Sequence, residues 1–507
     1  MKLLKRSTSN NLELFSEKEI NERGYGFRYK KNEYITFSEF PLNESAFLSF
    51  SRKHKYAIFT FLLLFIFSLI FNAHLTILAL VFLLTVIYFS DLLFNLLLVY
   101  RASNGHYELN ITKDEINRHD DKWPIYTIYC PLYKEAHILP QFVNAIKRLD
   151  YPKDRMQVML LLEEDDTTSV EAANKMNLPS YFEVHAIPHA YPKTKPKALN
   201  FGLTKSKGEF AVIYDAEDIP EKDQLKKAVI AFEKSDEKVI CIQAKLDFYN
   251  PHQNILTKVF TAEYSLWFSL VLTGLMSIDA PIPLGGTSNH FRLDKLRILN
   301  GWDPFNVTED CDLGIRLYKR GYRTQIINSH TFEEANSGYL NWIKQRSRWI
   351  KGYMQTYFVH MRNPAAFRKD WKDPHILTFQ LIVGGKVSSI LINPIMWLLT
   401  ICYFAFRPFI GPTVESFFPG PVLYMAIASL VVGNFLYTYY YMIGCARKEY
   451  DELLKYVFLV PLYWLSMSIA AWLAIFQLFL KPHYWFKTSH GFHLKDDKVL
   501  YQISSLQ

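Results

Sequence analysis

The stretch Val212-Ile213-Tyr214-Asp215-Ala216-Glu217-Asp218 runs from an apolar strand directly into a cluster of carboxylates. In open α/β sheets, ligands bind at the carboxyl ends of strands. Asp215 and Glu217 lie one residue apart on an extended chain, so both carboxylates project to a common side and suit a hard divalent cation that bridges substrate phosphates. Short acidic triplets are also common by chance, and a solvated strand end is the alternative interpretation. The stretch therefore predicts an α/β sheet with a candidate cation site.

The surrounding region, from Tyr107 to about Pro374, carries most of the charge, and we expect no run in it to span a membrane. Short β-rich runs alternate in it with helical patterns, which predicts a mostly parallel sheet. The expected strands are Trp123–Pro131, Met156–Leu162, Phe182–Ile187 and Phe210–Tyr214, and the expected helices are His137–Leu149, Ser169–Met176 and Lys197–Thr204.

Two further motifs follow in the same region. Thr308-Glu309-Asp310-Cys311-Asp312-Leu313 precedes an amphipathic helix over Gly314–Arg320, where acids can also serve only as caps or partners of the helix dipole. In Trp342-Ile343-Lys344-Gln345-Arg346-Ser347-Arg348-Trp349, the residues Gln345, Arg348 and Trp349 share one helical face. That face combines an amide, a guanidinium and an indole, although an interfacial helix with Arg and Trp anchors would show the same pattern.

The composition divides the chain between membrane and globular parts. Of 507 residues, 50% are hydrophobic, 16% aromatic and 21% charged, which excludes disorder and a low-complexity fibre. Five cysteines without a CxxC pair argue against a disulfide framework or a zinc ribbon. The net charge of +8 is too dispersed to predict nucleic-acid binding.

Long apolar stretches flank the charged region on both sides. Tyr56–Phe71 and Leu75–Tyr100 form an expected transmembrane hairpin, whose basic flanks place both ends in the cytoplasm. Asp91, inside the second stretch, is either a functional intramembrane carboxylate or a residue near the interface. The C-terminal stretches are Ser388–Phe406, Val422–Gly444 and Tyr456–Leu480, and Asn393-Pro394 and Pro461 interrupt two of them. Tyr456–Leu480 is expected to be re-entrant or interfacial before a cytoplasmic tail, and a fifth spanning helix is the alternative.

The motifs follow one another in a fixed order along the chain: strand-end acids, Asp-Ala-Glu, Thr-Glu-Asp and Gln-x-x-Arg-Trp. In this order the sequence resembles the membrane-embedded, inverting family 2 glycosyltransferases. These include the cellulose, curdlan, mannan and hyaluronan synthases and their bacterial exopolysaccharide relatives. The resemblance covers roughly Trp123 to Phe492 and implies a GT-A-type, Rossmann-like cytoplasmic domain inserted between transmembrane helices of the plasma (inner) membrane. The expected segments are a cytoplasmic segment 1–55, a transmembrane hairpin 56–101, a catalytic domain 107–335, interfacial helices 336–387, transmembrane or interfacial helices 388–480 and a cytoplasmic tail 481–507.

The resemblance also implies nucleotide-binding residues. Cys130-Pro131-Leu132-Tyr133-Lys134-Glu135 is similar to the family's opening nucleotide loop, with Tyr133 and Glu135 at the base and ribose. In Glu163-Glu164-Asp165-Asp166-Thr167, either Asp165 or Asp166 would contact the uracil or ribose side. Lys195-Pro196-Lys197-Ala198-Leu199-Asn200 is similar to the Lys-Ala-x-Asn segment, whose lysine, Lys197 here, approaches the diphosphate at a helix start that suits phosphate.

The catalytic and acceptor residues are implied in the same way. Asp215 and Glu217 align with the Asp-x-Asp metal motif and would bind Mg²⁺ or Mn²⁺, with Glu217 standing where many relatives have Asp. Asp310, beside Glu309, falls at the general-base position. The remaining implied residues are Gln345, Arg348 and Trp349 around the diphosphate and acceptor, Gly286 and His290 in a turn below the acceptor, and Trp485, Lys487, Thr488 and His490 in a gating loop.

The expected function is transfer of a hexose, with UDP-glucose as the expected donor, onto a growing β-glycan with export through the membrane helices. GDP-mannose and UDP-N-acetylglucosamine stay open as donors, and accessory export subunits are possible partners. The alternative is a non-processive enzyme with a lipid acceptor. A non-catalytic assembly subunit is disfavoured because all the expected carboxylates are present.

Overall fold

A mixed β-sheet forms the centre of the globular part of the protein. The computed structural model describes residues 12–105, 107–120, 122–367 and 375–483. Within them the eight-stranded sheet has the order β6-β5-β4-β7-β10-β9-β11-β8. The strands are β4 (Tyr126–Leu132), β5 (Met156–Glu163), β6 (Phe182–Ile187), β7 (Phe210–Ile213), β8 (Ile219–Pro220), β9 (Val239–Phe248), β10 (Asn289–Arg292) and β11 (Arg323–Glu333).

The expected sheet is mostly parallel, and the structure differs from this expectation at β10 and β8, which pair antiparallel with their neighbours. β6, β5, β4 and β7 are parallel neighbours, as expected of strand–helix alternation. β10 then pairs antiparallel with both β7 and β9, and β8 pairs antiparallel with β11. Since β10 reverses the direction twice, β9 and β11 run the same way as β7. The carboxyl ends of β4, β5, β7 and β11 therefore meet at one edge of the sheet.

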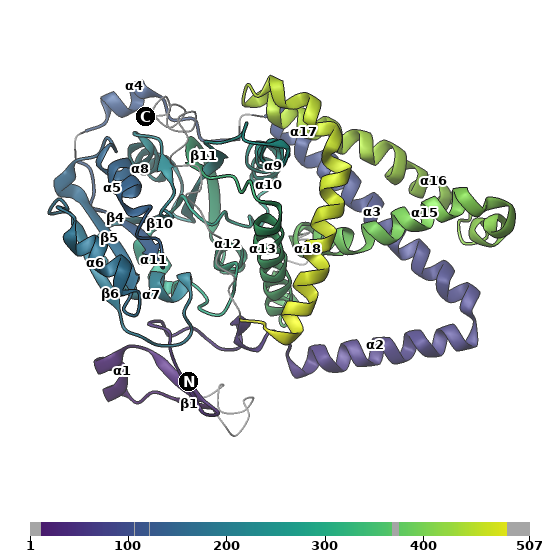
Figure 1. Ribbon diagram of the computed structural model, residues 1–507, viewed down its shortest axis with the longest axis horizontal. Coiled ribbons are helices and arrows are strands. Elements are labelled where there is room, and N and C mark those ends of the chain that lie inside the picture. The colour runs from purple at the N-terminus through teal and green to yellow at the C-terminus, as the bar shows by residue number, and fades with distance from the viewer. Residues whose placement is uncertain (1–11, 106, 121, 368–374, 484–507) are drawn as a thin grey trace.

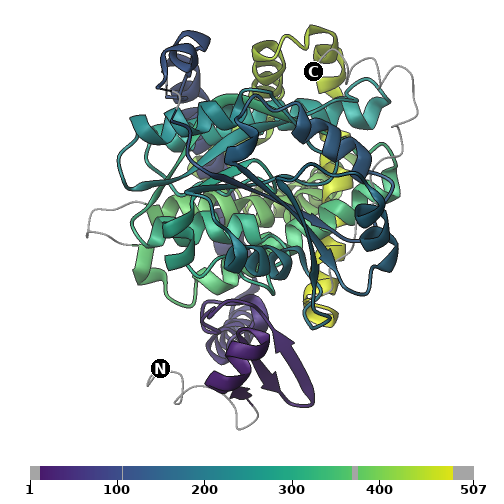
Figure 2. The ribbon, with the colours of Figure 1, turned by 90° about the vertical axis from the view of Figure 1, so that its left-hand side faces the viewer.

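Helices cover both faces of this sheet, so two hydrophobic cores form (Figures 1 and 2). One face is covered by α4 (Lys113–Arg118), α5 (Leu139–Lys147), α6 (Thr167–Lys175) and α8 (Gln224–Lys234). The other face is covered by α7 (Lys195–Lys205), α9 (Ile255–Leu266), α10 (Leu272–Ser277), α11 (Leu293–Ile298), α12 (Glu309–Lys319) and α13 (Tyr339–His360). The expected helices and strands of residues 123–214 are all present, with ends shifted by a few residues at most.

A small N-terminal unit packs below the sheet, as Figure 2 shows. It contains β1 (Leu12–Leu14), α1 (Glu17–Arg23), β2 (Gly26–Tyr29), β3 (Asn32–Ile35) and the short helix η2 (Ala46–Leu48). The carboxylate of Asp303 accepts hydrogen bonds from the Ser45 hydroxyl at 2.8 Å and the Ala46 N–H at 2.6 Å. The described part of the expected segment 1–55 is thus folded and hydrogen-bonded to the globular part of the chain.

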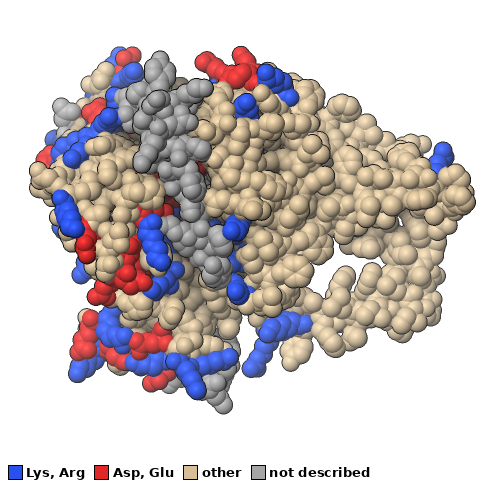
Figure 3. Space-filling view, viewed as in Figure 1, with Lys and Arg blue, Asp and Glu red and all other residues tan. Residues whose placement is uncertain are grey.

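Long apolar helices occupy the other half of the molecule, where Figure 3 shows few charged side chains. In the described part of the chain, six helices are long and apolar enough to cross a membrane. Five of the six contain α2 (Arg52–Phe71), α3 (Ala73–Asn104), α14 (His375–Phe379) with η6 (Gln380–Gly385) and α15 (Lys386–Glu415), α16 (Gly420–Ile427) with η7 (Ala428–Val432) and α17 (Gly433–Arg447), and η8 (Asp451–Leu459) with α18 (Val460–Leu480). The short helix η5 (Pro364–Phe367) follows α13 in the chain. Pro394 lies inside α15 as expected, but Pro461 lies in the first turn of α18, where its missing N–H interrupts nothing.

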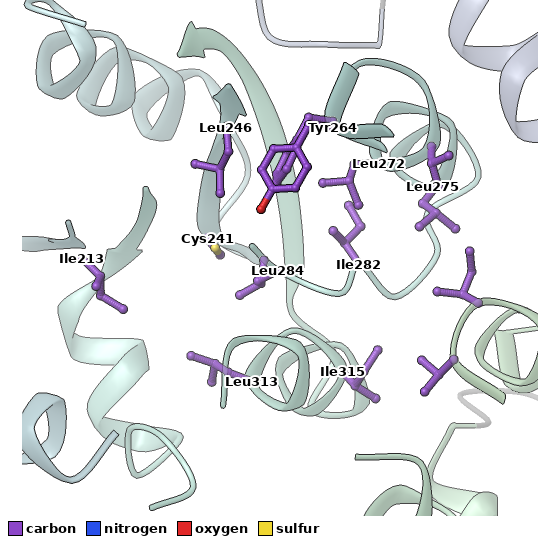
Figure 4. Close-up of a cluster of buried hydrophobic side chains, with 14 of the residues drawn as sticks. Ile213, Cys241, Leu246, Tyr264, Leu272, Leu275, Ile282, Leu284, Leu313 and Ile315 are labelled. Atoms are coloured by element: carbon purple, nitrogen blue, oxygen red, sulfur yellow. The ribbon is translucent and has the colours of Figure 1, made fainter. Parts of the chain in front are cut away.

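The expectation that no run between Tyr107 and Pro374 could span a membrane is wrong for one segment. Ile255–Ser277, which comprises α9, η4 (Trp267–Val271) and α10, is long and apolar enough to cross a membrane. However, 78% of its most apolar 18-residue stretch is buried inside the protein. A Cβ at Gly274 would lie 2.5 Å from the Leu98 carbonyl of α3, so the two helices touch backbone to backbone. Figure 4 shows side chains of this segment packed towards Leu246 of β9. The segment therefore joins the sheet to the apolar helices.

Candidate active site

A cavity of about 1530 Å³ opens at the edge where the strand ends meet. It is lined by the first residues after β4 and β7, by the last residues of β5 and β11, and by the start of α12. The polar residues around this part of the cavity include Tyr133, Glu135, Glu163, Lys193, Lys195, Asp215, Glu217, Glu309, Asp310, Glu333, Gln345 and Arg348. The fold therefore gathers residues from distant motifs around one space.

Lys195 is the lysine that reaches the acidic centre. Its Nζ lies 2.5 Å from Asp215 Oδ1 and donates to the Gly286 carbonyl at 2.8 Å. Burial alone would lower the pKa of Lys195, but Asp215, Glu309 and Asp310 outweigh burial and raise it. The ammonium is therefore charged at neutral pH and faces the cavity.

Lys197, which the motif comparison assigned to the diphosphate, does not line the cavity. Its side chain is fully buried, and its Nζ contacts Glu163 Oε2 at 2.7 Å and the Ala190 carbonyl at 3.2 Å. Residues two positions apart do not share a helical face, so Lys195 and Lys197 point to different surroundings. The structure places Lys195, and not Lys197, at the site.

The pair Asp165 and Asp166 lies beside the cavity rather than in its lining. Asp166 accepts from the Lys134 N–H at 2.5 Å and caps α6 by accepting from the Ser169 N–H at 3.3 Å. Asp165 accepts from Lys193 Nζ at 2.5 Å, and Lys193 is itself a lining residue. Asp166 therefore caps α6, whereas Asp165 contacts a residue that lines the cavity.

Two carboxylates offer a cation site. Asp215 and Glu217 both line the cavity, and burial followed by the charge of Asp215 raises the pKa of Glu217 to about 8. Asp218 faces away from it, accepting from the Asp215 N–H at 2.7 Å and from the Thr287 hydroxyl. Among the described residues, no group of three or more His, Cys, Asp or Glu is placed to hold a metal ion. Two hard oxygen donors fit Mg²⁺ or Mn²⁺ when substrate phosphates complete the coordination.

The start of α12 supplies two more acids. Burial, and then the nearby Asp310 charge, raises the pKa of Glu309 to about 8. Burial also raises the pKa of Asp310, although the Cys311 N–H at 2.7 Å, Lys195 and Arg348 oppose the rise. A Cβ at Gly286 would lie 3.3 Å from Asp310 Oδ2, so the backbone of the glycine turn passes close to this carboxylate.

The α13 residues Gln345, Arg348 and Trp349 all line the cavity, as their shared helical face predicts. Trp349 stacks against Tyr264 of α9, with ring centroids 6.4 Å apart. Gly286 of the expected acceptor turn also lines the cavity, but His290 does not. His290 is fully buried in β10, shares a 2.7 Å hydrogen bond between Nδ1 and the Tyr126 hydroxyl, and burial lowers its pKa to about 3. The expected gating residues Trp485, Lys487, Thr488 and His490 lie outside the described residues.

Several lining residues were not singled out from the sequence, namely Glu163, Lys193, Lys195, Glu263 and Glu333. Glu333 ends β11, and burial together with the Glu217 charge raises its pKa to about 8. The rule that identified Asp215, an acid directly after an apolar strand, does not select Glu333, because β11 has the sequence RTQIINSHTFE, with polar residues along most of its length.

The same cavity continues between the apolar helices. Its lining includes Thr85, Tyr88 and Asp91 of α3, and it reaches Phe417 and Phe418 beyond the end of α15. The Asp91 carboxylate accepts from Asn95 Nδ2 at 3.1 Å and from the Tyr437 hydroxyl of α17. Asp91 thus faces neighbouring helices and the cavity.

The fold and the acid-lined cavity define a GT-A-like α/β domain joined to apolar helices that fit a membrane. Residues 211–480 match the family described as glycosyl transferase family group 2, and the chain belongs to this family. It is therefore classed with the glycosyltransferases.

Individual relatives are more distant. "Probable glycosyltransferase YdaM" of Bacillus subtilis (strain 168) is 27% identical over 249 residues, which cover 48% of this chain. "Glucomannan 4-beta-mannosyltransferase 7" of Arabidopsis thaliana is 23% identical over 338 residues, or 60% of this chain. Each match spans 59% of the relative's own length. Among solved structures, the mannosyltransferase PcManGT of Pyrobaculum calidifontis in complex with GDP-Man and Mn²⁺ has 18% identity and a TM-score of 0.47, covering 80% of this chain and 99% of its own.

Proposed function

We propose that the protein is a membrane glycosyltransferase that transfers a hexose from a nucleoside diphosphate sugar, with inversion, onto a growing β-glycan and releases the product through its membrane helices. The observation that carries the proposal is the continuous cavity. One end contains Asp215, Glu217 and Asp310, and the other reaches Phe417 and Phe418 beyond α15. A chain extended at the acids would have a path leading away from them.

The donor would bind at the strand ends. Tyr133 and Glu135, after β4, would hold the nucleoside, and Lys195 and Arg348 would face the diphosphate. Asp215 and Glu217 would hold Mg²⁺ or Mn²⁺, which would supply positive charge near the leaving diphosphate. Because Lys195 Nζ lies 2.5 Å from Asp215 Oδ1, its ammonium is positioned beside the candidate cation site.

The transfer itself needs a base on the acceptor side of the sugar. Asp310 would take the proton of the acceptor hydroxyl as that oxygen attacks the anomeric carbon and the bond to the diphosphate breaks. The attack comes from the face opposite the leaving group, so the configuration inverts. Arg348 opposes the rise in the pKa of Asp310, and it would stabilise the carboxylate form that acts as the base.

The donor sugar has two candidates. UDP-glucose is the donor expected from the resemblance to glucan synthases. The similarity to a protein named as a glucomannan 4-beta-mannosyltransferase supports a mannosyl donor, GDP-mannose, as the alternative.

A lipid acceptor is the second candidate function, and the membrane part of the cavity favours it in one respect. Many of its lining residues are apolar, including Ile77, Leu80 and Leu84 of α3 and Ile392 and Leu399 of α15. An acyl or prenyl chain would be well solvated by such a wall. Polar lining residues at Thr85, Tyr88, Ser389, Asn393 and Thr400 favour the glycan instead.

We further propose that the catalytic domain faces the cytoplasm of a cell with the protein in its plasma membrane. Arg52, Lys53 and Lys55 at the start of α2 and Arg101 near the end of α3 support this orientation, because basic residues concentrate on the cytoplasmic side. The donor, a cytoplasmic metabolite in nucleotide form, would then reach the acids directly.

The experiment is a donor and product assay on the purified full chain. The protein is incubated with Mg²⁺ or Mn²⁺ and either UDP-glucose or GDP-mannose, and released nucleoside diphosphate and product length are measured. We expect release with one donor and a polymeric product, while a single sugar on a lipid would identify the second candidate. No release of nucleoside diphosphate with either donor would refute the proposed function.

A further inference from the structure

Glu333 is a cavity-lining carboxylate for which the proposed mechanism has no use. It ends β11, where its main chain pairs with Phe248 of β9 and its carbonyl accepts from the Tyr249 N–H at 3.1 Å. The backbone position of this side chain is therefore fixed by the sheet. One of its carboxyl oxygens, Oε1, is buried and has no hydrogen-bond partner among the described residues.

A buried carboxyl oxygen without a partner carries a cost that a ligand hydroxyl would remove. Leaving a buried acceptor unsatisfied destabilises the folded protein. Such groups are rare in folded proteins, and their persistence at the wall of a cavity points to a ligand. The chemistry offered by Glu333 is that of hydrogen bonding to an O–H group.

The surroundings of Glu333 indicate which ligand this is. Glu217 of the candidate cation site lies close enough for its charge to raise the pKa of Glu333. The Tyr264 hydroxyl also lies near the Glu333 carboxyl, and both residues line the cavity. Tyr264 stacks against Trp349 and contacts Phe268, with centroids 6.4 Å and 5.3 Å apart, and Figure 4 shows Tyr264 between Leu246 and Leu272.

Aromatic rings beside a carboxylate are suited to a pyranose, which has apolar C–H faces and hydroxyl edges. This aromatic wall lies on the membrane side of the acids, because the next lining residues, Trp267, Phe268 and Val271, belong to η4, the segment that joins the sheet to the apolar helices. An acceptor that approaches along the cavity from those helices would pass the wall before it reaches Asp310.

We propose that the Glu333 carboxyl accepts or shares a hydrogen bond with a hydroxyl of the terminal acceptor sugar, at the acceptor position where the family resemblance already places Trp349. This inference rests on the proposed function and assigns it an acceptor residue. It gives the site a donor side, at the ends of β4 and β7, and an acceptor side, at the end of β11.

The test compares the wild type with Glu333→Ala, Glu333→Gln and, as a surface control, Glu171→Gln on α6. The full chain is purified in a zwitterionic detergent, since a sugar detergent could occupy the acceptor position. Binding of cellotriose, mannotriose, and Mg²⁺ with UDP or GDP is measured by intrinsic tryptophan fluorescence, together with thermal melting to show that each variant is folded.

We expect Glu333→Ala to weaken binding of the preferred trisaccharide about two- to tenfold, the value of one hydrogen bond to an uncharged carboxyl group. Glu333→Gln, which keeps an acceptor oxygen, should lose less, and nucleotide binding should not change in either variant. A parallel loss of metal–nucleotide affinity would overturn the inference by placing Glu333 in the cation site. Unchanged trisaccharide binding in Glu333→Ala, or no binding of either trisaccharide to the wild type, would overturn it too. Release of nucleoside diphosphate by the wild type, measured separately, tests the proposed function itself.

Discussion

Gly352 of α13 determines how closely that helix approaches the catalytic acids, and replacing it with alanine should impair transfer. A Cβ at Gly352 would lie 2.2 Å from Oγ1, 2.4 Å from Cγ2 and 2.7 Å from Cβ of Thr308, the residue directly before Glu309 and Asp310. Non-bonded carbon atoms prefer separations of about 3.5–4.0 Å, so the two backbones must part by roughly 1 Å. Overpacking of this kind costs about 1–3 kcal/mol of stability.

The effect on turnover should be larger than the effect on stability. A misplacement of about 1 Å of a catalytic group can reduce the rate about 10²-fold, and Thr308 leads directly into the α12 turn that holds Asp310. We therefore expect Gly352→Ala to lower kcat about a hundredfold and to weaken nucleoside diphosphate binding less, because Tyr133, Glu135 and Lys195 would contact the donor from elements other than α13.

The assay measures nucleoside diphosphate release at saturating donor, nucleotide binding and thermal melting. Gly420→Ala serves as the control, because a Cβ there meets nothing within 4 Å. Adding Thr308→Ala to Gly352→Ala removes two of the three close atoms and should restore part of the activity, a coupling that the single variants cannot produce independently. A Gly352→Ala enzyme with full kcat, or a double variant no better than the single one, would refute the reasoning.

Three further predictions follow from the site. Lys195→Met should weaken nucleoside diphosphate binding about tenfold or more, because it removes the ammonium beside Asp215. Lys197→Met should instead lower the melting temperature, because it leaves Glu163 unpaired, and should reduce nucleoside diphosphate affinity much less. Equal losses of affinity in the two variants would contradict the assignment of Lys195 to the site. Chelation with EDTA should stop donor turnover and added Mn²⁺ should restore it, and activity that persists in excess EDTA would remove the cation from the account. Burial lowers the pKa of His290 from 6.5 to about 3, so below pH 6.5 the unfolded chain binds a proton that the folded protein does not, and stability falls as the pH falls. Between pH 6.5 and 4.5 the wild type should therefore lose roughly 2 kcal/mol more stability than His290→Gln. Parallel pH profiles of the melting temperature in the two proteins would contradict this prediction.

The sequence predicted the acidic edge well because strand ends are local features. The run Val212–Asp218 contains both the strand and its carboxylates, and the parallel register of β4, β5 and β7 then brings their carboxyl ends together. Gln345, Arg348 and Trp349 were predictable for the same reason, since helical periodicity alone places them on one face.

The errors concern side-chain direction and tertiary packing. Lys195 and Lys197 are two residues apart, and only the phase of α7 against the sheet decides which one enters the cavity. His290 points into the core behind β10, because the side chains of a strand alternate between the two faces of the sheet. Ile255–Ser277 is apolar enough for a membrane but is covered by the sheet and by α3, a fact that depends on contacts between distant segments.

The most direct test of the central claim, that Asp310 is the base for hexosyl transfer at the strand-end acids, is a single-turnover measurement on Asp310→Asn. The account predicts that the variant binds Mg²⁺ and nucleoside diphosphate as the wild type does but forms product at least about 10²-fold more slowly. Product formation at the wild-type rate, or a loss of nucleotide binding equal to the loss of turnover, would contradict it.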